Sequence, residues 1–367
     1  MKVNCDRAAL LEALNLASGV VVSRTPKPVL LCVKLEAANG TLALAATDLE
    51  AALHIQVEQV EVHEDGTAVI PADKLLAIVR ESADPTITIE TEGESAHLKG
   101  TDSHFKIFGH TPDEFPNVPA AAPDPDFEIS AEQLVAMIQR TIFATARETS
   151  RYAINGVLFE RDGKKLTMVA TVGRRLALSK GTTISSPKGE NTGTIVPSKA
   201  LNLLMRILDD PSEPVKVKLT ANQIHLATSR ATLTSNLVEG NFPPYKDVIP
   251  KEHDRKATFA TDILASAVRR AALLTNEESK GVKFAFNAEQ LVLSSRAPEM
   301  GESEINVPLE SFSGDPIEIG FNPQFVTDVL KVADAGEITL ELKAPNKPGT
   351  IKSGSDFVYV IMPVSLG

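Results

Sequence analysis

The feature that most constrains the fold of this chain is a threefold internal repeat. A strand, a proline-containing turn and a helix with apolar residues at helical spacing recur in segments 68–79, 194–205 and 319–330. The matching helix positions Leu75, Leu201 and Val326 lie 126 and 125 residues apart in the numbering. Solenoid repeats are about 20–50 residues long, whereas a period of this length has the size of a domain. The sequence therefore predicts three tandem copies of one fold.

Two segments of different composition mark the boundaries between the copies. Segment 119–125 is rich in proline and alanine, and segment 250–256 is polar, so neither favours packing into a core. These segments predict domains at 1–122, 123–252 and 253–367. Each is large enough to bury its own core, and the 43% hydrophobic and 23% charged content is that of an ordinary globular protein.

Local patterns predict the fold class of each copy. Apolar residues at helical spacing predict helices over 131–147 and 198–209, with Ser130 and Thr261 as candidate N-caps of helices in the second and third copies. Alternating apolar residues predict strands at 87–89, 215–219 and 338–342. The expected fold is α+β, with two helices packed on largely antiparallel sheets in each copy.

The distribution of charge points to an anionic partner in spite of the net charge of −11. That net charge argues against a simple basic nucleic-acid binder. Cations nevertheless recur on the predicted helix faces of all three copies: Lys74, Arg80, Arg140, Arg147, Lys199, Arg206, Arg269, Arg270 and Lys331. A solvated helix face is the simpler interpretation of any one of them, and Asp73, Glu81 and Asp328 lie on the same helices. Three similar wedges can form part of a ring, whose basic lining would suit an anionic rod contacted without sequence readout.

The composition gives no sign of export or of a membrane span. No apolar run approaches the roughly 18 residues that cross a bilayer, and Asp6 falls where a signal peptide needs its apolar stretch. Cys5 and Cys32 have no spacing typical of a disulfide framework or a zinc site. We expect a cytoplasmic protein.

Several short motifs, taken together and in order, resemble a known family. They occupy segments 47–50, 151–160, 169–177, 195–197, 242–245, 274–277, 320–322 and 359–363. With them the chain resembles the bacterial DNA polymerase III beta subunit, the sliding clamp family, over essentially its whole length. The resemblance implies a head-to-tail homodimer whose six domains close a ring around double-stranded DNA. It also implies partnership with the DNA polymerase III catalytic subunit, the clamp loader and other proteins with clamp-binding motifs, no cofactor or metal, and no catalysis.

The resemblance also implies three sets of site residues. The partner-peptide pocket would comprise Ile154, Thr171, Gly173, Arg174, Arg175, Leu176, Pro243, Val248, Phe325, Val360, Ile361, Met362, Pro363 and Val364. Residues that contact DNA would be Arg24 and Tyr152 by this resemblance, and the charge pattern described above adds the helix cations Arg80, Arg140, Arg147, Lys199 and Arg206. The dimer interface would comprise Lys74, Phe105, Ile107, Leu273, Leu274, Glu299, Glu302 and Glu304. From composition alone, a place in the core is the favoured interpretation of the pocket residues, and the apolar interface residues could equally be core residues.

Some positions depart from the pattern of the family. Val172 replaces a usual Asp, Arg174 a usual His and Phe325 a common Tyr, while Asp247 stands where an Arg is common. The segment 364–367 lacks the usual penultimate Arg. We expect a pocket that still binds apolar-anchored peptides, with an altered polar preference.

Two other classes of function remain to be distinguished from a clamp. An enzyme is disfavoured because the sequence has no phosphate-binding loop, no nucleophile elbow and no zinc-protease motif. Asp48 and Glu50 could form a carboxylate pair, which a metal-dependent hydrolysis assay would reveal. A β-rich adhesion module would need neither cationic helix faces nor retention on circular DNA.

Overall fold

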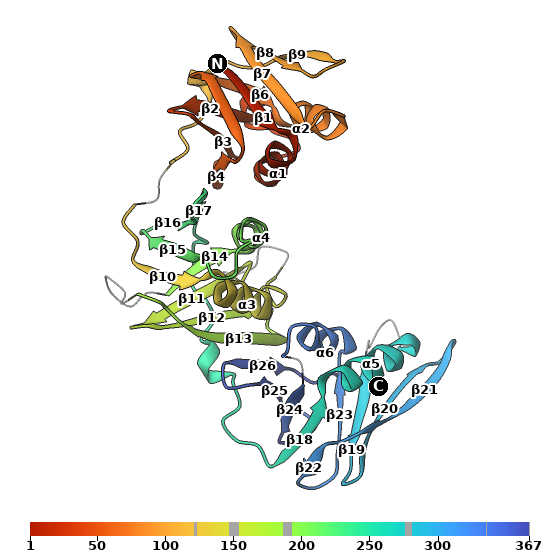
Figure 1. Ribbon diagram of the computed structural model, residues 1–367. Coiled ribbons are helices and arrows are strands. Elements are labelled where there is room, and N and C mark those ends of the chain that lie inside the picture. Colours follow the sequence, from red (N-terminus) through yellow and green to blue (C-terminus); the bar gives the residue numbers. More distant parts are fainter. Residues whose placement is uncertain (121–122, 147–153, 186–192, 276–280, 335, 367) are drawn as a thin grey trace. The chain divides into compact units, whose positions relative to one another are not determined.

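The computed structural model describes residues 1–120, 123–146, 154–185, 193–275, 281–334 and 336–366 (Figure 1). Their contacts divide the chain into two compact units. The first unit comprises Met1–Glu132, Thr183–Glu190 and Lys199–Leu237, and the second comprises Gln133–Thr182, Asn191–Ser198 and Val238–Gly367. The middle third of the chain therefore contributes to both units. Arg147 and Tyr152, which were predicted to contact DNA, lie outside the described residues.

The first unit contains two antiparallel sheets. The five-stranded sheet has the order β5 (Val60–Glu64), β1 (Lys2–Asp6), β7 (Thr86–Glu92), β8 (Ser95–Lys99), β9 (His104–Phe108). The eight-stranded sheet has the order β10 (Phe127–Ser130), β15 (Pro214–Leu219), β16 (Gln223–Ala227), β17 (Ala231–Asn236), β4 (Ala51–Val57), β3 (Thr41–Thr47), β2 (Cys32–Ala38), β6 (Gly66–Pro71). Because β17 pairs with β4, strands from the first third and from the middle third of the chain form one continuous sheet.

The second unit also contains two antiparallel sheets. The nine-stranded sheet has the order β14 (Gly193–Pro197), β11 (Gly156–Asp162), β12 (Lys165–Thr171), β13 (Arg175–Thr182), β26 (Phe357–Ile361), β25 (Gly349–Ser353), β24 (Glu337–Leu342), β18 (Arg255–Ala260), β22 (Ser311–Ser313). The four-stranded sheet has the order β21 (Gly301–Pro308), β20 (Gln290–Ala297), β19 (Val282–Phe286), β23 (Ile317–Phe321). Here the pairing of β13 with β26 joins strands of the middle and last thirds.

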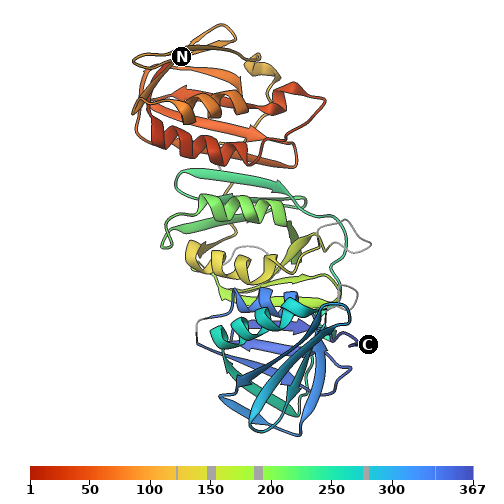
Figure 2. The ribbon, with the colours of Figure 1, turned by 90° about the vertical axis from the view of Figure 1, so that its right-hand side faces the viewer.

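Helices complete the α+β fold that the sequence predicted. Within the described residues they are α1 (Arg7–Ser18), α2 (Ala72–Glu81), α3 (Ala131–Ile142), α4 (Ser198–Ile207), α5 (Thr261–Ala271) and α6 (Pro323–Leu330), with short 3-10 turns η1 (Pro28–Leu31), η2 (Pro112–Glu114), η3 (Tyr245–Asp247) and η4 (Ala272–Leu274). Figure 2 shows α1 beside α2 in the first unit and α5 beside α6 in the second. The predicted alternating strands are confirmed as parts of β7, β15 and β24.

The helices begin where side chains or prolines favour it. The Asp6 carboxylate accepts the Ala9 N–H at 2.9 Å and caps α1. In the third repeat the Asn322 side chain caps α6 by accepting the Gln324 N–H at 2.9 Å, and Pro323 occupies the first helical position. The prediction of Thr261 as a cap is wrong by one residue, because α5 begins at Thr261 and Ala260 is its N-cap.

Two helices end earlier than predicted. After Ile142 the backbone N–H groups bond to the carbonyl of the third preceding residue, as in a 3-10 turn. The Ala144 N–H donates to the Thr141 carbonyl, so α3 ends at Ile142 and not at the predicted residue 147. Helix α4 ends at Ile207 rather than 209, where Asp209 and Asp210 precede a proline. Acidic side chains at a helix C-terminus oppose its dipole, and the residue before proline disfavours helical geometry.

The core of the second unit is aromatic at its centre. Phe284, Phe321, Phe259 and Phe286 are buried, and the rings of Phe284 and Phe321 meet edge to face with centroids 5.3 Å apart. Such packing fixes the four-stranded sheet against the nine-stranded one within this unit, because Phe259 of β18 contacts Phe286 of β19.

Candidate functional site

β13 lies beside β26 in the second unit (Figure 1), and apolar side chains gather on one face of this strand pair. Leu176 lies opposite Val360, and Thr171 of β12 lies opposite Leu176. Directly opposed residues on neighbouring strands share one face of a sheet. Leu176 and Val360 are buried in one cluster, so they form the floor of this patch.

Two exposed apolar residues flank this floor. Val248 and Met362 are 54% and 41% exposed, so both present apolar surface to solvent. Together with Thr171, Leu176 and Val360 they define what we call the apolar face. An exposed apolar rim beside a buried apolar floor is typical of a surface that binds apolar side chains of a partner.

The segment around η3 (Tyr245–Asp247) packs on this floor and is held there by a polar contact. Tyr245 of η3 packs into the floor cluster, and its hydroxyl donates a hydrogen bond to the Glu160 carboxylate. Burial and this hydrogen bond raise the pKa of the Tyr245 hydroxyl. Burial opposes ionisation of Glu160, but the hydrogen bonds from Tyr245 and Lys246 outweigh it and lower the pKa of Glu160. The segment is thereby fixed to β11.

Arg175 belongs to the opposite face of the same strand. It lies opposite Ile361, which is fully buried. Its guanidinium contacts the Asp328 carboxylate at 2.7 Å, donates to the Phe143 carbonyl at 2.6 Å, and stacks 4.4 Å from the centre of the Phe325 ring. Arg175, Ile361 and Phe325 thus pack on the helix side, away from Leu176.

The turn between β12 and β13 is fixed by its own hydrogen bonds. The Thr171 hydroxyl donates to the Arg175 carbonyl at 2.8 Å, and Gly173 adopts a φ of +81° that favours glycine. Arg174 is exposed, and its carbonyl accepts the Met362 N–H at 2.9 Å. This last bond holds the segment after β26 beside the turn.

The end of the chain is seated on β23. Pro363 and Val364 are half-buried, and the Val364 N–H donates to the Gly320 carbonyl at 2.9 Å. A Cβ at position 320 would lie 2.5 Å from the Val364 carbonyl and 2.8 Å from Leu366, so only glycine allows this approach. The two remaining predicted pocket residues, Ile154 and Pro243, are half-buried.

The outermost strand of the five-stranded sheet, β9, exposes large apolar side chains. Phe105 is 44% exposed and Phe108 is 73% exposed. Ile107, by contrast, is buried opposite a residue of β8. Lys74 is exposed, with its Nζ 3.3 Å from the Asp73 carboxylate. Of the predicted interface residues in the first unit, Phe105 and Lys74 are therefore available at the surface.

The outermost strand of the four-stranded sheet, β21, has an acidic and partly apolar border. Leu273 in η4 is 75% exposed and Met300 is 61% exposed, whereas Leu274 is half-buried. The predicted carboxylates are all exposed: Glu299, Glu302 and Glu304. An unpaired strand edge with exposed apolar side chains favours pairing with another strand.

The predicted DNA-contacting cations divide into two groups. Arg24 and Arg80 are exposed. Arg206 is also exposed, although its guanidinium donates to a backbone carbonyl of α1 at 2.9 Å. Arg147 and Tyr152 belong to the residues that the structure does not describe.

Two of these cations are held by carboxylates. Arg140 forms ion pairs with Asp334 and with Asp356, the latter at 2.9 Å, and its side chain is only 12% exposed. Lys199 forms an ion pair with Asp48. Asp48 is therefore the partner of a lysine, and its other oxygen accepts the Glu50 N–H, an arrangement that offers no pair of free carboxylates.

Three family models match the chain in order and almost without gaps. They are the N-terminal domain of the DNA polymerase III beta subunit at residues 1–119, the central domain at 128–244 and the C-terminal domain at 246–365. The chain belongs to the DNA polymerase III beta subunit family.

Relatives and solved structures of this family match the whole chain. The beta sliding clamp of Escherichia coli K12 is 34% identical over 374 residues, which cover 100% of both chains, and that of Pseudomonas putida is 33% identical with the same coverage. The crystal structure of the sliding clamp of Pseudomonas aeruginosa bound to griselimycin is 32% identical and superposes with a TM-score of 0.93 over 100% of both chains. The three-domain clamp fold is thus confirmed.

The described residues were also compared with the patterns of metal sites, membrane spans and reactive thiols. No group of three or more metal-ligating side chains was found among them, and no helix among them is long and apolar enough to cross a membrane. Cys5 and Cys32 are free thiols, and burial raises their pKa values to about 12 and about 11, so neither is a ready nucleophile.

Sequence reasoning missed three residues that lie beside predicted site residues. Phe108 and Met300 are exposed beside the predicted interface residues, and Asp328 holds Arg175. The sequence did carry a signal for Phe108: adjacent Ile107 and Phe108 cannot both face the core of an alternating strand. Nothing local in the sequence indicates the Asp328 contact.

Proposed function

We propose that two copies of this chain join head to tail into a ring around double-stranded DNA, and that the apolar face tethers the replicative polymerase to it. Family membership makes the chain a DNA sliding clamp, a processivity factor of DNA replication. The three domains would be 1–122, 123–252 and 253–367. The chain itself would catalyse no reaction and need no cofactor.

The observation that carries this proposal is the pair of open sheet edges. β9 and β21 are terminal strands of their sheets, and each is bordered by exposed apolar side chains, Phe105 and Phe108 at one and Leu273 at the other. The exposed Lys74 of one copy would face the carboxylates of Glu299, Glu302 and Glu304 of the other copy. Edges of opposite character favour a heterologous contact between copies, which closes into a ring when the rotation permits.

The charges on the helices favour a contact with DNA that is electrostatically weak. Arg24, Arg80 and Arg206 are exposed, whereas Arg140 and Lys199 are held by carboxylates. Partly neutralised cations attract a phosphate backbone weakly. Enclosure by a ring would retain the DNA without strong binding and would leave the clamp free to slide.

The apolar face would bind short peptides of the DNA polymerase III catalytic subunit, the clamp loader and other proteins that carry clamp-binding motifs. Its buried floor of Leu176 and Val360 and its exposed border of Val248 and Met362 would accept branched or aromatic anchors. Asp247 and Arg174, both exposed, place opposite charges beside it. These charges would set the polar preference.

Retention on DNA of defined topology tests the proposal. We expect protein loaded by a clamp loader onto nicked circular DNA to stay bound at high salt and to dissociate after one restriction cut, because only topology holds it. Phe105→Asp should reduce both the dimer fraction in sedimentation and this retention. Release before cutting, or unchanged retention after it, would contradict the ring.

A further inference from the structure

A second hollow lies on the same face of the nine-stranded sheet, further along β13. Leu176, Leu178 and Lys180 alternate along this strand and point to one face. Leu176 belongs to the apolar face, whereas Leu178 and Lys180 line a cavity of about 680 Å³. Cavities of roughly 300–1,000 Å³ are the size of ligand pockets in proteins.

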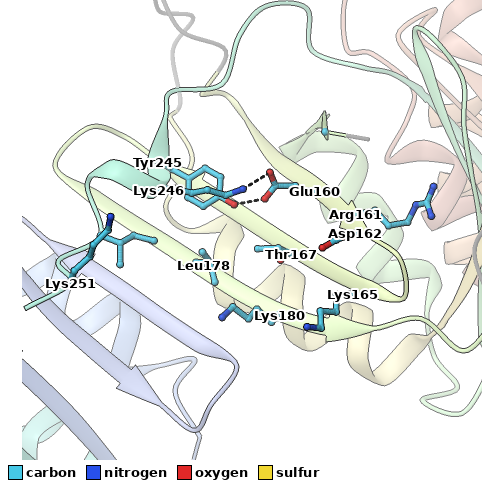
Figure 3. Close-up of a pocket in the computed structure, with 12 residues that line it drawn as sticks. Glu160, Arg161, Asp162, Lys165, Thr167, Leu178, Lys180, Tyr245, Lys246 and Lys251 are labelled. Carbon is cyan, nitrogen blue, oxygen red and sulfur yellow. Dashed lines mark hydrogen bonds and ion pairs between the residues drawn. The ribbon is translucent and has the colours of Figure 1, made fainter. Parts of the chain in front are cut away.

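Lysines surround this cavity, which we call the lysine pocket. Lys165, Lys180, Lys246 and Lys251 all line it. In Figure 3, Lys165 and Lys180 lie along one side and Lys246 and Lys251 along another, with Leu178 between them. Four lysines converge here on a chain whose net charge is −11.

Most of this positive charge is not neutralised within the protein. The Lys246 ammonium is 2.9 Å from the Glu160 carboxylate. Lys165, Lys180 and Lys251 form no ion pair with any residue in the described part of the chain, although one carboxylate, that of Asp162, also lines the cavity. Three lysines against one carboxylate leave a positive site that favours an anionic ligand.

The floor of the lysine pocket is apolar. Leu178 is 5% exposed and Tyr245 is 7% exposed, and Ile249 packs against the same cluster. The hydrogen bond from Tyr245 to Glu160 fixes the aromatic ring at the border of this floor. A ligand that fits would combine carboxylates at its edges with a large apolar group at its centre.

We propose that the lysine pocket is a second docking site of this protein, which binds an acidic peptide segment of a partner. One large apolar side chain would pack on Leu178 and Ile249, and flanking carboxylates would contact Lys165, Lys180 and Lys251. A peptide fits better than a row of phosphates, because an apolar side chain between acidic ones matches the apolar floor that lies among the lysines.

The lysine pocket is separate from the apolar face, although one segment borders both. Val248 is part of the apolar face, whereas Tyr245, Lys246, Ile249 and Lys251 of the same segment line the lysine pocket. The proposal uses no residue of the apolar face. It therefore stands or falls independently of the peptide binding proposed there.

A labelled acidic peptide tests the proposal directly. The probe is a fluorescein-labelled peptide with a central phenylalanine between two pairs of aspartates, titrated with the full-length protein in an anisotropy experiment. We expect saturable binding that weakens as salt is raised. Each exposed ion pair contributes modestly to binding, so reversing two charges with Lys165→Glu and Lys180→Glu should weaken binding by about tenfold.

Two control variants and two control probes complete this test. Lys164→Glu changes an exposed lysine on the adjoining turn that does not line the cavity, and Met362→Asp changes the apolar face; both should bind the probe as the wild type does. Replacing the central phenylalanine of the probe with glycine should abolish binding. Equal affinity of the double variant, an equal loss in Lys164→Glu, no saturable binding, or tighter binding of labelled oligothymidylate would each overturn the proposal.

Discussion

Two strand pairs join neighbouring thirds of this chain, β17 with β4 and β13 with β26, and their corresponding faces differ in polarity. At the first joint, Thr232 lies opposite His54 on one face of the sheet. The Thr232 hydroxyl donates to the Ala120 carbonyl at 3.4 Å, and His225 Nδ1 is 2.9 Å from the Thr234 hydroxyl oxygen. The polar groups on this face therefore have partners within the protein.

At the second joint the same arrangement carries apolar pairs. Leu176 lies opposite Val360 and Leu178 opposite Val358. These side chains form no hydrogen bonds, and Met362 is exposed at their border. The surface beside this joint gains free energy by covering apolar area, at roughly 25 cal/mol per Å².

The comparison teaches that the side chains, rather than the fold, decide which joint can bind a partner. Both joints are antiparallel strand pairs crossed by the segment that leads to the next third of the chain. A face of hydrogen-bonded threonines would lose contacts with water on binding an apolar ligand and gain little. A face of leucine and valine has no such cost.

The largest effect that we predict is a difference in the stability lost when an ion-paired arginine is removed from each unit. Arg175→Ala should lower the free energy of unfolding by about 3 kcal/mol, because it removes the guanidinium at 2.7 Å from the largely buried Asp328 carboxylate and leaves it with the Gln324 amide and the more distant Lys331 ammonium. Arg230→Ala in the first unit should cost under about 1 kcal/mol, because its partners Glu12 and Asp209 are more than half exposed. Urea denaturation followed by circular dichroism measures both, and equal losses would contradict the difference in burial.

The next effect concerns binding rather than stability. Met362→Asp should weaken the binding of a labelled clamp-binding peptide by about 2 kcal/mol, or roughly 30-fold. A carboxylate would replace an apolar contact at the border of the floor. The matched control is Leu49→Asp, which changes a 51% exposed leucine near the first joint at a positive φ that aspartate tolerates. Unchanged affinity in Met362→Asp, or an equal loss in the control, would refute the placement of the apolar face.

Both joints show where prediction from the sequence reaches its limit. The threefold repeat and the alternating strands predicted the fold class, and the resemblance brought Leu176 and Val360 into one set. The strand pairings themselves join residues far apart in sequence: Leu176 and Val360 are separated by 184 positions, and Leu53 and Leu233 by 180. No local pattern specifies which outer strands of two domains will meet.

Side-chain direction was the other limit. The continuous set from Val360 to Val364 overlooked the alternation of a strand, which turns Ile361 into the core while Val360 faces the other way. Arg175 was grouped with its neighbour Leu176 for the same reason, and it points toward α6 instead. Whether Arg175 also takes part in partner binding stays a prediction.

A smaller effect should appear in the pH dependence of the first joint. Burial lowers the pKa values of His54 and His225 below their ordinary 6.5, so between the two values the unfolded chain binds more protons than the folded one. Stability should therefore fall as the pH falls from about 7 to about 5, because the unfolded histidines take up protons that the folded ones resist. The variant H54Q/H225N should lose this part of the slope, whereas H253Q, at a 41% exposed histidine, should keep it. Urea midpoints at both pH values measure the slope, and identical slopes in all three proteins would contradict the assignment.

The smallest effect that we predict sharpens the comparison of the two crossing segments. Asp247 is exposed beside the apolar face, and Asp124 is exposed in the segment beside the first joint. A clamp-binding peptide flanked by lysine should bind more tightly than one flanked by aspartate by about 0.5 kcal/mol, because exposed ion pairs contribute little and salt screens them. Asp247→Arg should reverse this preference, and Asp124→Arg should leave it unchanged. If both variants shifted the preference equally, the overall net charge rather than a local contact would govern it, and the polar border assigned to the apolar face would be wrong.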